Sequence, residues 1–283
     1  MTLKKDKNKI KSALYIVSTP IGNLLDITHR ALDILKQSDI ILCEDTRISK
    51  KLLSHYEIQS KLVSYHKFNE KKNLKKIFEK LKKNFIISLI SDAGTPAISD
   101  PGRVLINGCV EENISIIPIP GPSALTAAIS ISGFSDKFYF HGFLSDTENS
   151  IRKEFEMLKS FNCSTIFFIS AQKLVKQIKT IKEFFYDREI IICREITKLH
   201  ESIYRSKISD IDNLKFNPKG EVTVIISEKD NNIKEDLNES DKKNIKKLIQ
   251  TKSIKDIVRI ITEEKYISKS KIYNYCLKIK NEK

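Results

Sequence analysis

The sequence predicts an α/β protein with two α/β domains and a small helical segment at its end. In the first half, apolar runs of strand length alternate with amphipathic, helix-like stretches. In the second half, several strand-like runs follow one another directly, and a polar stretch then precedes a basic end. Alternating strands and helices predict a mostly parallel sheet covered on both faces, whereas consecutive strands predict a mixed sheet.

The first domain is expected to contain five strands and four helices. We place the strands at 14–18, 40–43, 62–65, 85–90 and 114–119, and the helices at 28–37, 46–55, 70–83 and 101–112. The helix pattern is clearest in 70–83, where apolar residues recur at i, i+3, i+4 and i+7 as Leu74, Ile77, Phe78 and Leu81. In a parallel sheet of this kind, ligands bind beside the carboxyl ends of the strands.

The second domain is expected to follow the proline-rich segment "PIPGPSA" at 118–124. Its predicted strands are 138–144, 165–170, 189–194, 202–206 and 222–227, and its predicted helices are 148–160 and 172–185. We therefore expect a basic tail at 1–11, domains at 12–121 and 122–228, a polar linker at 229–241, and a basic helical segment at 242–283.

Charge is concentrated at the two ends of the chain. The formal net charge is +14, of which residues 1–11 carry +4 and residues 240–283 carry +8. Basic ends on a nearly neutral body favour a polyanionic partner such as nucleic acid. The alternative is two solvated tails without such a partner.

The chain is expected to be cytoplasmic. Its longest apolar stretch, 114–134, is broken by prolines and cannot span a membrane, and its start does not have the pattern of a signal sequence. Five cysteines are scattered without a CxxC pair, so we expect neither a disulfide framework nor a metal site.

Four loops marked by glycine, proline or acidic residues each follow a predicted strand of the first domain. They are "STPIGN" (18–23), "CEDTR" (43–47), "SDAGTP" (91–96) and "PIPGPSA" (118–124). Any one can be an ordinary turn, but all four lie at the same edge of the sheet. They contain Glu44, Asp45 and Asp92 but few basic residues, and the chain has no P-loop and no G-x-G-x-x-G after a strand. This chemistry favours a positively charged, ribose-bearing ligand without phosphate.

These motifs resemble those of the ribosomal RNA small-subunit methyltransferase I family, within the S-adenosylmethionine-dependent tetrapyrrole methylase superfamily. The resemblance rests on "LYIVSTPIGNLLDITHRALDIL", "EDTR", "SDAGTPAISDPG" and "PIPGPSA", and continues in "YHKFNE", "FHGFL", "REITKLHE", "KGEVTVII" and "SKSKIYNYCL". It implies a class III methyltransferase fold and methyl transfer to the 2′-hydroxyl of a cytidine in the decoding region. It also implies S-adenosylmethionine between the two domains and, commonly, a homodimer.

The sequence departs from this family at two places. The segment "FFISAQK" (167–173) has Ile169 and Gln172 where the family usually has a glutamate and a histidine. If those side chains contact RNA or take part in catalysis, the departure puts activity in doubt; if they only pack the domain, it does not. Ser18 stands where proline is frequent.

The resemblance suggests roles for residues of the four loops. Pro20 and Gly22 would shape one wall of the cofactor site. Backbone groups around Asp92, Gly94 and Thr95 would hold the cofactor's tail and ribose. Ser123 and Ala124 would border its adenosine. The alternative for Asp92 is a turn aspartate that bonds its own backbone.

Candidates for the general base are Asp45, our first choice, together with Glu44 and His66. Alternatively, Glu44 or Asp45 caps the helix that starts near Thr46, and His66 lies on the surface. The expected RNA contacts are Arg47, Arg103, Arg194, Lys269, Lys271 and Tyr273. For the arginines the alternative is an internal ion pair, and for the terminal segment it is a solvated helical cap.

The expected partner is small-subunit ribosomal RNA or the assembled small ribosomal subunit. Two other functions stay open from the sequence alone. One is carbon methylation of a tetrapyrrole by the same fold, which the basic ends disfavour. The other is a non-catalytic RNA-binding or ribosome-assembly protein, which the departures at Ile169 and Gln172 keep open.

Overall fold

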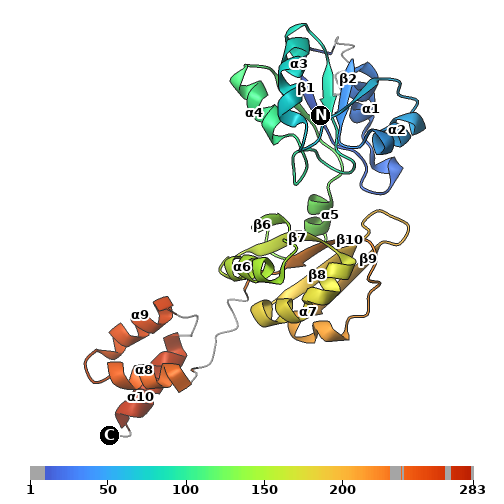
Figure 1. Ribbon diagram of the computed structural model, residues 1–283. Coiled ribbons are helices and arrows are strands. Elements are labelled where there is room, and N and C mark those ends of the chain that lie inside the picture. Colours follow the sequence, from blue (N-terminus) through green and yellow to red (C-terminus); the bar gives the residue numbers. More distant parts are fainter. Residues whose placement is uncertain (1–9, 230–236, 238, 265–268, 282–283) are drawn as a thin grey trace, which may run out of the picture. The chain divides into compact units, whose positions relative to one another are not determined.

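The computed structural model describes residues 10–229, 237, 239–264 and 269–281 (Figure 1). The chain divides into two compact units, Met1–Glu228 and Lys229–Lys283. The first unit holds both α/β domains and the second holds the terminal helices. The expected basic tail lies almost wholly outside the described residues, as does most of the expected linker.

The first domain is a five-stranded parallel sheet, as the alternating pattern predicts. Its strands are β1 (Leu14–Val17), β2 (Ile40–Cys43), β3 (Lys61–Ser64), β4 (Ile87–Leu89) and β5 (Ile116–Ile119), in the order β3-β2-β4-β1-β5. Its helices are α1 (His29–Gln37), α2 (Thr46–His55), α3 (Glu70–Lys82) and α4 (Arg103–Glu111). A 3₁₀ turn, Leu24–Asp26, precedes α1.

Two apolar clusters cover the two faces of this sheet. One contains Leu35 of α1 and Leu53 of α2, and the other contains Ile77 of α3 and Leu105 of α4. Successive residues of β1 belong to opposite clusters, as the period of two in a strand requires. Figure 1 shows α1 and α2 on one side of the strands and α3 and α4 on the other.

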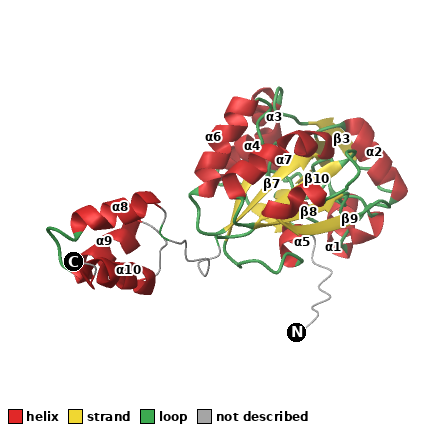
Figure 2. Ribbon diagram, turned by 90° about the horizontal axis from the view of Figure 1, so that it is seen from below, coloured by secondary structure: helices red, strands yellow, loops and turns green. Residues whose placement is uncertain are grey.

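The second domain is a mixed five-stranded sheet in the order β6-β7-β10-β8-β9. Its strands are β6 (Phe138–Phe143), β7 (Ser164–Ser170), β8 (Glu189–Arg194), β9 (Ser202–Lys207) and β10 (Glu221–Ile226). Only β6 and β7 run parallel, and the other neighbours are antiparallel. Helices α6 (Glu148–Lys159) and α7 (Ala171–Phe185) pack on one face (Figure 2).

The other face of the second sheet is covered by α5 (Ala124–Ser130), which the sequence pattern does not reveal. It has only seven residues and follows three prolines, so it shows no extended amphipathic period. Its Ala128 packs with Ile166, Ile191 and Ile225. The connection between the domains is therefore partly helical. A 3₁₀ segment, Ile208–Asn213, also follows β9.

The terminal unit consists of α8 (Glu239–Leu248), α9 (Ile254–Glu264) and α10 (Lys269–Asn281). Its core is formed by the buried side chains of Ile245, Ile257, Ile261, Ile272 and Cys276. Helix α8 begins inside the segment expected to be linker. No helix among the described residues is both long and apolar enough to cross a membrane. All five cysteines are free.

A substitution at Gly102, the residue just before α4, would show how tightly the turn before this helix is packed. Its φ is 140°, and a Cβ there would lie 2.9 Å from Cδ2 of Leu89 and 3.2 Å from Cβ of Ala97. We expect Gly102→Ala to lower the free energy of unfolding by about 1–3 kcal/mol, measured in urea. Gly133→Ala is the control, because Gly133 has φ 71° but no atom within 4 Å of such a Cβ. Equal losses in both variants would contradict the packing contribution.

Candidate functional site

A cavity of about 330 Å³ lies between the two α/β domains. Its first-domain wall is formed by the loops that follow β1, β4 and β5, and its second-domain wall by residues at the ends of β7, β8 and β10. This is the carboxyl edge of the parallel sheet, where ligands of such sheets bind. Its volume falls within the range of small-molecule sites, roughly 300–1,000 Å³.

All four expected loops are joined by hydrogen bonds at this edge, and "CEDTR" is joined through Asp45, whose backbone N–H donates to Asp92 Oδ1 at 3.2 Å. Thr19 and Gly94 exchange two backbone hydrogen bonds of 2.9 and 3.0 Å. The hydroxyls of Ser18 and Thr95 lie 2.9 Å apart, and Thr95 Oγ1 donates to the carbonyl of Pro122 at 3.2 Å. Ser18, which stands where the family frequently has proline, thus joins the loop after β1 to the loop after β4.

The first-domain wall is acidic. Asp92 and Asp100 line the cavity, and Glu44 lies beside them. Burial and then repulsion from Glu44 raise the pKa of Asp100 to about 6. Burial followed by the charge of Asp92 raises the pKa of Glu44, and burial raises the pKa of Asp92. A bound cation would relieve this mutual repulsion.

The second-domain wall is largely apolar where it faces the acidic wall. Phe143, Phe168 and Ile169 line it, and Ile169 is only 5% exposed. Cys193 also lines it, and burial raises the pKa of this thiol to about 11. The departure at Ile169 therefore makes part of the cavity wall apolar. Gln172 is exposed in the first turn of α7 and does not line the cavity.

The cavity wall includes one lysine, Lys198, whose charge is neutralised. Its Nζ lies 3.1 Å from Glu195 Oε1 and 2.8 Å from Glu221 Oε2. The same loop is joined to the loop after β1, because Thr197 Oγ1 accepts a 3.0 Å hydrogen bond from the backbone of Asn23. A Cβ on Gly22 would lie 2.4 Å from Cγ of Lys198, so glycine permits this close approach.

The structure brings five of the seven expected cofactor residues to the cavity wall. These are Asp92, Gly94, Thr95, Ser123 and Ala124. Pro20 and Gly22 do not line it, but Ile21 between them does. Sequence reasoning missed Ile21 and Asp100. Asp100 lies in "SDPG", a continuation of the loop already singled out, so the same strand-end position could have revealed it.

None of the three expected general bases lines the cavity. Asp45 caps α2 by accepting from the backbone of Arg47, and it forms a 2.6 Å ion pair with that guanidinium. These hydrogen bonds with Arg47 lower the pKa of Asp45 to about 2. His66 lies in the turn after β3, near Glu44, whose pKa is raised by burial and then by the charge of Asp92.

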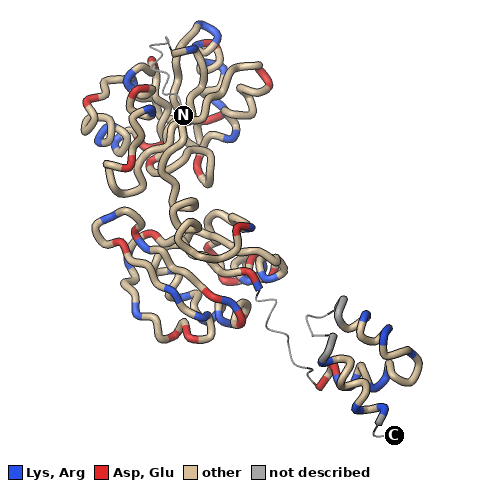
Figure 3. Tube along the Cα trace, turned by 180° about the vertical axis from the view of Figure 1, so that it is seen from behind, with Lys and Arg blue, Asp and Glu red and all other residues tan. Residues whose placement is uncertain are grey.

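The expected RNA contacts lie in different environments. Arg47 and Arg103 are exposed at the starts of α2 and α4. Arg194 is only 6% exposed, and its guanidinium donates to the carbonyls of Lys219 and His200, which favours a structural role. Lys271 and Tyr273 are exposed on α10, in a unit rich in lysine (Figure 3). The side chain of Lys269 lies outside the described residues.

Comparison with known proteins agrees with this architecture. Residues 13–212 match the model of the Tetrapyrrole (Corrin/Porphyrin) Methylases family. In the solved structures, the fold resembles the uroporphyrin-III C-methyl transferase from Thermus thermophilus complexed with S-adenyl homocysteine. That similarity has a TM-score of 0.52 at 13% identity, over 76% of this chain and 97% of that chain. The family model places this chain in the tetrapyrrole methylase family, and the solved structure shows the same fold.

Two relatives define the family more narrowly. The ribosomal RNA small subunit methyltransferase I of Mesomycoplasma conjunctivae is 48% identical over 76% of this chain and 91% of the relative. The protein of that name from Buchnera aphidicola is 39% identical over 94% of this chain and 96% of the relative, which brings the terminal unit into the match. The chain belongs to the ribosomal RNA small subunit methyltransferase I family.

Proposed function

We propose that this chain transfers the methyl group of S-adenosylmethionine to the 2′-hydroxyl of a cytidine in small-subunit ribosomal RNA. The observation that carries the proposal is the position of the cavity. This chain belongs to a methyltransferase family. Its cavity lies at the carboxyl edge of the parallel sheet and is lined by the "SDAGTP" loop. Relatives named for ribosomal RNA methylation supply the substrate class.

The residues of the cavity fit S-adenosylmethionine. Its wall contains glycine, serine and alanine, which let a nucleoside approach the backbone closely. Asp92 and Asp100 offer negative charge to a sulfonium cation, and the one lysine of the wall is already paired. When bound, this cofactor supplies an electrophilic methyl group that needs no metal or redox partner.

The chain's own residues would then orient the reactants and accept one proton. Backbone groups around Gly94 and Thr95 would hold the donor in the cavity, where alignment of oxygen, carbon and sulfur can contribute ~7–11 kcal/mol. Asp100 would accept the proton of the ribose hydroxyl as that oxygen bonds to the methyl carbon and the bond between the methyl carbon and sulfur breaks, which leaves S-adenosylhomocysteine. We propose Asp100 for this role in place of Asp45, because Asp100 lines the cavity and its pKa of about 6 is better matched to proton transfer.

The finer features of the proposal follow from the family resemblance. The RNA is bound alone or within the assembled small subunit, the reaction takes place in the cytoplasm, and the active form is a homodimer. Two cavities would then act in each dimer. Chemical cross-linking of the full chain in dilute solution tests the dimer separately from the reaction.

Mapping of ribose methylation in small-subunit RNA tests the proposed function. RNA from cells with and without this protein is digested and analysed by mass spectrometry. The proposal requires one methyl group that is lost with the protein and restored by the wild-type chain. If no methyl group is lost, the proposal is wrong. In vitro, activity that falls steeply with salt supports RNA as substrate, whereas a tetrapyrrole methylase would respond weakly.

The acidic wall predicts a pH-dependent preference for the charged cofactor. Because the pKa of Asp100 is about 6, protonation below that pH removes negative charge from the cavity. We expect affinity for S-adenosylmethionine to fall by roughly tenfold between neutral pH and about pH 5, measured by calorimetry. S-Adenosylhomocysteine lacks the sulfonium charge and serves as the control. Parallel changes for both ligands would contradict an electrostatic role for the wall.

A further inference from the structure

We infer that Phe68 and the lysines around it form a platform that binds a single-stranded segment of the RNA substrate beside the cavity. The aromatic ring would stack on an unpaired base, and the lysines would contact the adjoining phosphates. The inference rests on the proposed function, since it names the surface through which the same site would receive its RNA. It does not involve the terminal helices.

Phe68 is held outward by an ordered turn. Its side chain is 95% exposed, the largest value among the large hydrophobic residues that the structure describes. Asn69 fixes the turn by accepting from the backbone of His66 at 2.9 Å and donating to the carbonyl of Ser64 at 3.1 Å. The backbone of Phe68 also donates to Nδ1 of His66 at 3.3 Å. These hydrogen bonds fix the backbone of the turn, so the exposed ring projects from a defined position.

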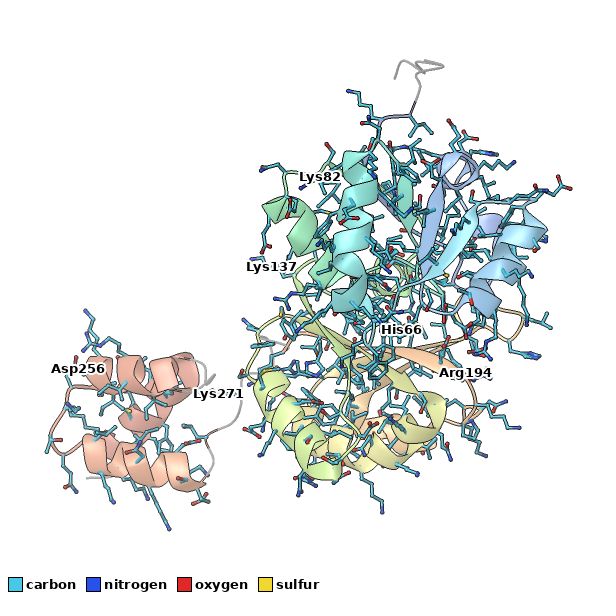
Figure 4. The ribbon with its side chains drawn as sticks, turned by 45° about the horizontal axis from the view of Figure 1, so that its top comes forward. His66, Lys82, Lys137, Arg194, Asp256 and Lys271 are labelled. Carbon is cyan, nitrogen blue, oxygen red and sulfur yellow. The ribbon has the colours of Figure 1, made fainter. Side chains whose placement is uncertain are left out.

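The turn lies at the edge of the sheet where the cavity opens. It follows β3 directly, and Tyr65 donates its backbone N–H to the carbonyl of Cys43 at the end of β2. His66 interacts electrostatically with Glu44, which in turn raises the pKa of the cavity residue Asp100. Figure 4 shows His66 at the end of the first domain that faces the second, with Lys82 at the opposite end of α3.

Exposed lysines surround this turn and continue along the first half of α3. They are Lys67, Lys71, Lys72, Lys75 and Lys76. Glu70 and Glu79 are the acids of the segment 65–80. Within the described residues none of the five lysines forms an ion pair, whereas Lys82, at the far end of α3, pairs with Glu112 at 2.5 Å. Five cations without ion-pair partners therefore lie on the turn and on the half of α3 nearer the cavity, although Lys83 at the far end forms no ion pair among the described residues either.

This combination favours single-stranded RNA over a protein partner. Every base offers a π-face to an aromatic ring, and lysines placed around the ring match the phosphates on either side of the base. An interface for a protein would instead call for a contiguous apolar patch. The chain neighbours of Phe68 are Lys67 and Asn69, so its ring projects from a polar, cationic surface.

The test measures binding of a fluorescein-labelled, single-stranded oligoribonucleotide to the full chain by anisotropy. Phe68→Ala is expected to raise the dissociation constant roughly five- to hundred-fold. Phe68→Trp keeps an aromatic ring and is expected to bind nearly as tightly as the wild type. The double variant Lys71→Gln/Lys72→Gln is expected to lower the slope of log affinity against log salt by about 1.4, or ~0.7 for each phosphate that the variant no longer neutralises.

Two matched variants serve as controls. Tyr186→Ala removes an exposed aromatic ring beyond the end of α7, and Lys176→Gln/Lys179→Gln removes two exposed charges on α7. Each should bind the oligoribonucleotide nearly as the wild type does. Unchanged affinity in Phe68→Ala, or equal losses in the control variants, would overturn the inference.

The two proposals can fail independently. Because binding is measured without methyl transfer, a wild-type chain that transfers no methyl group overturns the proposed function, while the anisotropy result still decides on the platform. Calorimetry with S-adenosylmethionine should give the same affinity for Phe68→Ala as for the wild type. If Phe68→Ala bound S-adenosylmethionine more weakly, this variant would disturb the cavity. RNA binding by Phe68→Trp would then show whether an aromatic ring at this position is what the RNA requires.

Discussion

Replacing Gly94 by valine is expected to abolish detectable binding of S-adenosylmethionine. Gly94 lines the cavity with φ 77°, a backbone conformation that is strained for a β-branched residue. A Cβ there would lie 3.3 Å from Cγ2 of Ile21, and valine would add two methyl groups beyond it. These would fill space that the cofactor needs. Calorimetry with the purified chain is expected to show at least a hundredfold loss, about 2.7 kcal/mol.

Gly133→Val is the control, because Gly133 has a similar positive φ and valine there carries a similar backbone strain. Its φ is 71°, and no atom lies within 4 Å of the position that a Cβ would take, so Gly133→Val carries the conformational penalty alone. Both variants should lose similar stability in thermal unfolding. Gly133→Val should bind the cofactor as the wild type does. If Gly94→Val also bound normally, the cofactor would not occupy this cavity.

Asp100→Asn is expected to reduce the rate of methyl transfer at saturating substrates by roughly 10²–10⁴-fold, the usual contribution of a general base. The amide has nearly the same shape as the carboxyl group but cannot accept the proton of the ribose hydroxyl. Asp45→Asn is the matched control, because Asp45 lies outside the cavity wall and is paired with Arg47. A larger loss in Asp45→Asn than in Asp100→Asn would return the role to Asp45.

The pH dependence of the methyl-transfer rate is a second test of Asp100 as the general base. A base must be deprotonated, so the wild-type rate should rise with pH through about 6 and level off above it, and Asp100→Asn should lack this limb. The effect on stability has the opposite sign. Because the pKa of Asp100 rises from 3.8 to about 6 on folding, its carboxylate lowers stability as pH increases through that window. Asp100→Asn should therefore unfold at an equal or higher temperature at neutral pH.

Most of the fold follows from local patterns in the sequence. The helix at 46–55 and the strands at 40–43 and 189–194 have the bounds expected from their apolar periods. The two strands are continuous apolar runs buried on both faces, and the helix buries one face, so each pattern can be recognised from the sequence. The strand expected at 85–90 is shorter, Ile87–Leu89, and α5 was not expected. Both are short elements whose limits depend on packing against distant residues.

By itself the sequence determined the class of fold and the edge of the sheet at which the site lies, because strand direction fixes where the loops with Asp92 and Gly94 must meet. The tertiary structure alone decided which side chains face the cavity. Ile21 lines the cavity and Pro20 does not, and Ile169 lies on the opposite wall. Asp100 lies among other carboxylates, whereas Asp45 is paired with Arg47. The physical reason is that a side chain's direction, burial and charged neighbours depend on residues remote in the chain, which no local pattern contains.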